Sequence, residues 1–158
     1  MSTAADTNAP AAAPALGGRR VLVLREPGAA GAEALDIARE LDLHQSATVT
    51  VVAVAPQAPS GPRCGGSALE FNAAVRETVA EELDQARERL GHAAGRTDYV
   101  LLVEGEDPPL EEWIAVGGFD LVLLPARRRL LRTPGHPAAA RLRTMSGAEV
   151  QIVQPRRV

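Results

Sequence analysis

The segment Tyr99–Leu124 narrows the possible fold class more than any other part of this sequence. It reads YVLLVEGEDPPLEEWIAVGGFDLVLL, two strand-length apolar runs separated by an acidic turn and a helix-length stretch. Two strands joined through a helix form a parallel pair, because the crossover returns the chain to the edge where it started. A parallel sheet needs helices over both of its faces. The segment therefore predicts an α/β fold.

The rest of the sequence repeats this alternation of strand and helix. Strands are expected at 21–24, 47–54, 99–103, 121–124 and 150–153, and helices at 31–43, 67–90, 109–116 and 138–145. In the helix over 67–90, an apolar stripe is predicted for Leu69, Val75, Val79, Leu83, Ala86 and Leu90. Right-handed crossovers favour a doubly wound, five-stranded parallel sheet in the order 3-2-1-4-5. Any ligand is expected at the carboxyl ends of the strands, near residues 24–31 and 124–132.

Composition indicates one domain. The chain has 158 residues, of which 46% are hydrophobic, enough for a single core. We expect an Ala/Pro-rich disordered tail over 1–18 and an α/β domain over 19–154. A net charge of −3 gives no indication of a nucleic acid or an anionic membrane as partner. The sequence shows neither a signal peptide nor an apolar run of about 20 residues, so a cytoplasmic location is expected.

The only cysteine, Cys64, follows Arg63 in a Gly/Pro-rich stretch. It has no intramolecular disulfide partner. Two interpretations stay open: a thiol acidified by the neighbouring charge, which would sense redox conditions, or an incidental loop cysteine.

Two motifs resemble the universal stress protein family, one of the adenine-nucleotide α-hydrolase-like Rossmannoid folds. VLVLREPG followed by Ala34 and Leu35 is similar to the family's first strand and turn, ILVAVDGS, and places Glu26 on the aspartate position. VEGEDPPL and FDLVLL are similar to the family's later VVEGDPAE and ADLIVMG. The resemblance covers residues 19–154. It implies the α/β fold and a homodimer paired through the last strand.

The last strand is predicted to be the dimer interface. An apolar edge without charged residues needs protection, and pairing with a second copy would supply it. The interface residues are expected to be Val150, Gln151, Ile152 and Val153.

The family's nucleotide motif is degenerate in this chain. Nucleotide-binding members carry glycines after the fourth strand, where backbone amides approach the phosphates. Here Pro125 and Arg128 stand at the first two glycine positions, and the third falls near Ala138 or on Gly135 and His136. Proline lacks a donor, and a long Arg side chain fills phosphate space. The resemblance therefore implies that ATP is not bound through this motif.

A different ligand region remains open, with ATP or another adenine nucleotide as the alternative cofactor. Its candidate residues are Glu26, Gly28, Gly31, Arg127, Arg128, Arg132, Gly135 and His136. The arginines would bind an anion bidentately, or would form a solvated basic loop. The glycines would present helix amides to an anion, or only permit a tight turn. A carboxylate at position 26 would accept hydrogen bonds from a ribose, or be solvated.

No catalytic or metal-binding residues are predicted. The spacing of His, Cys, Ser and Asp matches no nucleophilic arrangement or zinc site. The leading hypothesis is a non-catalytic regulatory or interaction module, dimeric and acting through an unidentified protein partner. An anion- or nucleotide-binding protein is the alternative, and a nucleotide-dependent enzyme the lesser one.

Overall fold

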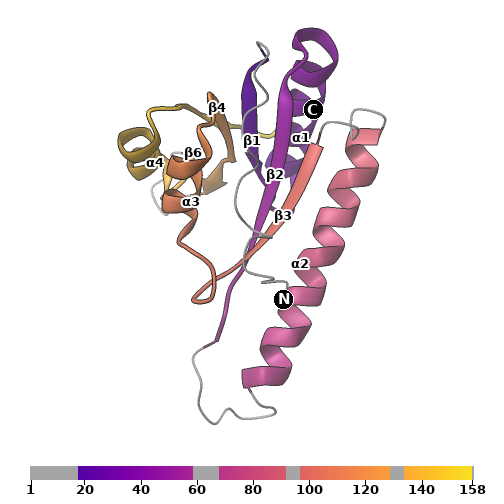
Figure 1. Ribbon diagram of the computed structural model, residues 1–158. Coiled ribbons are helices and arrows are strands. Elements are labelled where there is room, and N and C mark those ends of the chain that lie inside the picture. Colours follow the sequence, from indigo (N-terminus) through magenta and orange to yellow (C-terminus); the bar gives the residue numbers. More distant parts are fainter. Residues whose placement is uncertain (1–17, 59–67, 92–96, 129–133, 158) are drawn as a thin grey trace, which may run out of the picture.

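The computed structural model describes residues 18–58, 68–91, 97–128 and 134–157. Five parallel strands form one sheet in the order β3-β2-β1-β4-β7 (Figure 1). Their bounds are β1 Arg20–Leu24, β2 Thr48–Ala55, β3 Thr97–Val103, β4 Leu121–Pro125 and β7 Glu149–Val153. The predicted fold class and strand order are confirmed, each predicted strand lying within two residues of its observed start.

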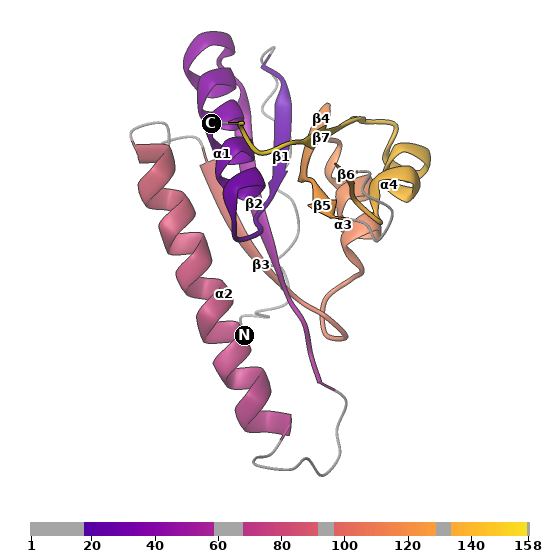
Figure 2. The ribbon, with the colours of Figure 1, turned by 180° about the vertical axis from the view of Figure 1, so that it is seen from behind.

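Helices cover both faces of this sheet. They are α1 Ala29–Gln45 and α2 Ala68–Leu90 on one face, and α3 Leu110–Gly117 and α4 Ala139–Ser146 on the other (Figure 2). Successive side chains of a strand point to opposite faces. Val21 and Val23 of β1 accordingly lie in the core under α1 and α2, while Leu22 and Leu24 lie under α3 and α4. None of the helices in the described ranges has the length and hydropathy to span a membrane.

Strand β1 is the topological switch point of the sheet. It pairs with β2 on one side and with β4 on the other. The chain therefore leaves β1 and β4 in different directions, which opens a crevice at their carboxyl ends. Ligands of doubly wound folds bind in this crevice, so the residues that follow β1 and β4 decide what the fold can hold.

A small ladder after β4 was not predicted from the sequence. Strands β5, Arg127–Arg128, and β6, Pro134–Gly135, pair antiparallel, with Arg127 opposite Gly135. The expected feature here was a basic loop, since two-residue strands containing Pro and Gly carry no periodic signal. The ladder returns the chain to the end of β4 and places His136 there.

The apolar stripe predicted for α2 is only partly buried. All the buried residues of the helix, Val79, Leu83, Ala86 and Leu90, lie in its second half. Leu69 is 80% exposed, so the predicted apolar stripe continues beyond the buried part of the helix. The physical reason is length: the first half of α2 extends past the carboxyl end of β3, where no sheet lies beneath it (Figures 1 and 2).

Candidate functional site

A cleft of about 1170 Å³ opens at the carboxyl ends of the strands. Its floor is formed by Leu24 of β1, Val54 of β2 and Leu102 of β3. The first half of α2 forms one wall, and the turn between β3 and α3 forms another. Residues that follow β1 and β4, including Glu26, Arg127 and His136, line its inner end. The cleft thus lies where the fold class predicts a ligand.

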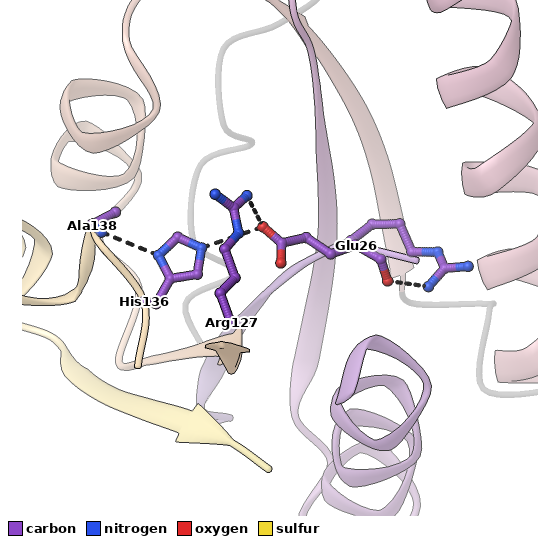
Figure 3. Close-up of polar contacts among 5 residues, drawn as sticks. Glu26, Arg127, His136 and Ala138 are labelled. Carbon is purple, nitrogen blue, oxygen red and sulfur yellow. Dashed lines mark hydrogen bonds and ion pairs between the residues drawn. The ribbon is translucent and has the colours of Figure 1, made fainter. Parts of the chain in front are cut away.

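The carboxylate of Glu26 is held by two side chains from the far side of the switch point (Figure 3). Its Oε1 accepts a hydrogen bond from the guanidinium of Arg127 and lies 3.3 Å from Nε2 of His136. The Glu26 side chain is 15% exposed and that of His136 only 4%. This Glu26 cluster, meaning Glu26, Arg127 and His136, connects the end of β1 to the segment after β4.

The hydrogen bonds of His136 fix its tautomer. The backbone N–H of Ala138, at the start of α4, donates to Nδ1 over 3.1 Å (Figure 3). Nδ1 therefore has no proton of its own in the neutral ring, and Nε2 carries it. That N–H donates to Glu26, so the ring connects the amide at the start of α4 to the carboxylate after β1.

The cluster keeps Glu26 ionised. Burial raises the pKa of the Glu26 carboxyl, while hydrogen bonds from His136 and Arg127 lower it, and the net pKa lies below its ordinary value of 4.5. Hydrogen bonds to the charged form outweigh desolvation here because two donors converge on one oxygen. Of the two interpretations of Glu26, the solvated one does not describe this structure.

Arg25 supports the cluster, and its role was missed in the sequence. Its guanidinium donates to the backbone carbonyl of Glu26 over 2.7 Å and to that of Glu82 over 3.2 Å. It therefore joins the end of β1 to α2. Burial lowers the pKa of Arg25, and the charge of Glu82 partly offsets this effect. An Arg directly after a strand has no spacing signal that would identify such a contact.

The two glycines after β1 have structural roles. Gly28 begins α1 with a φ of 106°, a conformation that side chains disfavour. A Cβ on Gly31 would lie 1.8 Å from the carbonyl oxygen of Glu26, so only glycine permits α1 to start this close to the strand end. Both glycines serve the turn that presents Glu26.

Of the remaining residues singled out in the sequence, two lie in the described part of the structure and two lie outside it. Gly135 is buried in β6, and the backbone of Arg128 lies in β5. Arg132 and Cys64 lie outside the described residues. Within the described ranges, no group of three or more His, Cys, Asp or Glu side chains is placed to hold a metal ion.

Several described residues of the segment that would carry the glycine motif lie in strands. Pro125 is a buried residue of β4, paired with Val153 of β7. Arg128 pairs with Pro134 in the small ladder. The described backbone on either side of 129–133 is thus committed to strands.

No protein-family model matches this sequence, and no curated protein matches it. Solved structures do resemble the chain. A universal stress protein family structure from Burkholderia pseudomallei aligns with a TM-score of 0.62 and 22% identity, covering 85% of this chain and 94% of the other. UspA from Lactobacillus plantarum aligns with a TM-score of 0.67 and 14% identity, covering 85% and 97%.

The chain has the universal stress protein fold. A third structure of this fold, from Archaeoglobus fulgidus, was solved in complex with dAMP and aligns with a TM-score of 0.54 and 14% identity, covering 89% of this chain and 98% of the other. The strand order that the sequence predicted is therefore shared with universal stress proteins. At such identities the likeness concerns the fold, and the site has to be judged by its own residues.

The Glu26 cluster makes a pH-dependent contribution to the stability of this universal stress protein fold. We expect Glu26→Gln to lower the free energy of unfolding by about 1 kcal/mol at neutral pH, because an amide loses the charge-assisted hydrogen bonds while the half-exposed Arg127 is screened by water. The folded pKa lies below the unfolded one, so the contribution is complete above pH 4.5 and disappears as the pH falls through the folded pKa. Urea unfolding of both proteins over this pH range measures it.

Glu33→Gln is the matched control. The Glu33 side chain is also 15% exposed, but its partner, Arg156, is 74% exposed. We expect a loss of about 0.5 kcal/mol or less. A Glu26→Gln loss that equals the control, or that persists unchanged in acid, would contradict the role assigned to the cluster.

Proposed function

We propose that this chain is a divergent member of the universal stress protein family and acts as a non-catalytic regulatory module, through protein contacts and not through ATP. The observation that carries the proposal is the Glu26 cluster. It lines the inner end of the switch-point crevice with the protein's own carboxylate, guanidinium and imidazole. A nucleotide-binding site of this fold class needs that space for the ligand.

Charge and backbone both support this proposal. The Glu26 carboxylate is ionised and 15% exposed, so a phosphate brought beside it would meet a like charge in a poorly hydrated place. The charge of Arg127 is also partly neutralised already by its ion pair with Glu26, which weakens its attraction for a phosphate. The strand pairing of Pro125 and Arg128 offers no free glycine amides in compensation.

We expect calorimetric titration with ATP, AMP, dAMP and cyclic AMP, with and without magnesium, to show no binding at micromolar to submillimolar ligand. The physical reason is that the positive charge of Arg127 in the crevice is already neutralised by the Glu26 carboxylate. Glu26→Gln serves as the comparison, because it removes the like charge while keeping the shape of the side chain. Micromolar affinity of the unmodified protein for any of these nucleotides would refute the proposal.

An anion- or nucleotide-binding function is the second candidate, and one feature favours it. The Arg127 side chain lines the cleft and is 54% exposed, so its guanidinium has room for a second oxygen ligand. A protein with this fold was solved in complex with dAMP, which supports a nucleotide as the class of ligand. If nucleotides raise the melting temperature and Arg127→Ala and Arg128→Ala each abolish the rise, this candidate replaces the first.

A homodimer formed through β7 is the other part of the proposal. β7 is an edge strand, and the backbone of Glu149 and Val153 bonds to the β4 side. The alternate residues, Val150 and Ile152, therefore turn their backbone groups to the open edge. The side chains of Val150 and Val153 are buried in their own chain, so pairing would rest on backbone groups, Gln151 and the half-buried Ile152.

Arg143 from α4 competes for this edge. Its guanidinium donates to the carbonyl of Val150 over 3.2 Å, which satisfies one of the edge acceptors within the chain. A second copy would have to displace Arg143 or pair beside it. The edge is thus less open than the absence of charged residues between Val150 and Val153 indicated.

We expect Ile152→Asp to convert a dimer into a monomer at micromolar concentration, because two carboxylates would face each other across the paired edges. Sedimentation velocity measures the change. Met145→Asp is the control, since Met145 is 42% exposed and belongs to α4 and not to the edge strand. A dimer that survives in Ile152→Asp with a normal melting temperature would exclude pairing through β7.

A further inference from the structure

One face of α2 continues the apolar stripe of the core into the cleft. The residues of α2 that line the cleft are Phe71, Ala74, Val75, Thr78, Val79 and Glu82. They recur at intervals of three and four, so they lie on one side of the helix. Phe71 is 46% exposed and Val75 is half-buried, whereas Val79 at the edge of the sheet is 7% exposed. The stripe becomes progressively more exposed where α2 leaves the sheet.

The opposite wall contains apolar residues beside acidic ones. The turn between β3 and α3 contributes Pro108, Pro109 and Leu110, and the floor is aliphatic. Arg76 on α2 forms an ion pair with Glu106 of this turn, and Gln57 after β2 also reaches Glu106. These contacts connect the two walls, and the space between them is present in the protein without any ligand. Preformed grooves bind with a smaller entropic cost than surfaces that must reorganise.

The size of the groove favours a peptide. The cleft that contains it has a volume of about 1170 Å³, which exceeds the roughly 300–1,000 Å³ of most small-molecule pockets. An apolar helical stripe opposite a second apolar wall is the arrangement that binds apolar side chains of a partner segment at intervals of three or four residues. We refer to this space, between residues 71–82 and 108–111, as the α2 groove.

The charge of the groove selects the kind of segment. Five acidic side chains and three arginines line the cleft. Arg25 and Arg127 already bond to oxygens of this protein, and the third arginine, Arg141, lies on α4. Glu104 and Glu111, on the wall opposite α2, have no ion-pair partner among the described residues. A basic segment complements this wall, whereas a second copy of this chain would bring the same acidic wall and a net charge of −3.

We propose that the α2 groove docks a segment of a partner protein whose apolar side chains are flanked by arginine or lysine. This assignment rests on the proposed function, for which it supplies the class of partner. Phe71 and Val75 contact the apolar side chains, and Glu104 and Glu111 bind the basic ones. The Glu26 cluster closes the inner end of the groove and does not contact the segment.

A fluorescent helical peptide built from Leu and Arg, with Leu at every third or fourth position, tests the proposal against a twin in which Glu replaces Arg. We expect the Leu/Arg peptide to bind the full chain at micromolar concentration and about tenfold more tightly than its twin, measured by anisotropy. Phe71→Ser should weaken binding about tenfold, because it removes the central apolar contact. Val116→Ser is the matched control, since Val116 is 80% exposed on α3 and does not line the cleft.

The charge assignment has its own pair of variants. Glu104→Arg combined with Glu111→Arg should reverse the preference toward the Leu/Glu peptide, while Glu40→Arg combined with Glu88→Arg, at exposed positions outside the groove, should not. The proposal would be overturned if both peptides bound equally, or if the groove variants and the control variants had equal effects. It would also be overturned if the Leu/Arg peptide bound tightly and Phe71→Ser left its affinity unchanged.

This outcome is separable from that of the proposed function. Nucleotide binding is decided by calorimetry without any peptide. If no nucleotide binds and the Leu/Arg peptide does not bind as expected, the regulatory module is retained and the groove is rejected. If a nucleotide binds and the peptide affinity stays unchanged, the proposed function is rejected and the groove is retained.

Discussion

The interaction of the Glu26 carboxylate with Arg127 and His136 holds together the structure at the carboxyl ends of the strands. The carboxylate lies after the central strand and accepts hydrogen bonds from Arg127 and His136, two residues that follow β4. A doubly wound sheet separates its chain paths at this point. In this protein an internal ion pair bridges the separation, and its side chains line the crevice in which the fold class holds a ligand. The same contact fixes the start of α4 through His136 and the amide of Ala138.

The fold was predictable from the sequence, because apolar periodicity and strand length act locally. Two apolar runs around one short helix specified a parallel pair, and the same pattern along the chain specified the strand order. The site was predictable only as a region. Glu26 was recognised as a candidate ligand residue, but its partners lie 101 and 110 residues away, and no local spacing indicates which of several arginines it meets. The small ladder of β5 and β6 was missed for the same reason.

The exposure of α2 shows where periodicity is misleading. Leu69 continues the helical stripe in sequence, yet the sheet ends before it. A stripe predicts which face of a helix is apolar and not how far a neighbouring layer extends. Because α2 extends past the end of the sheet, a groove lies beside its first half. At the carboxyl end of the sheet, the Glu26 cluster therefore lies on the β4 side and the groove on the α2 side.

The most direct test of this account is the nitrogen NMR spectrum of the His136 imidazole, assigned by comparison with His136→Gln and recorded before and after addition of ATP. The account predicts that the proton of the neutral ring lies on Nε2, that Nδ1 accepts from Ala138, and that neither shift changes with ATP. A ring protonated on Nδ1, or shifts of His136 that move as ATP saturates the protein, would contradict a crevice closed by its own Glu26 cluster.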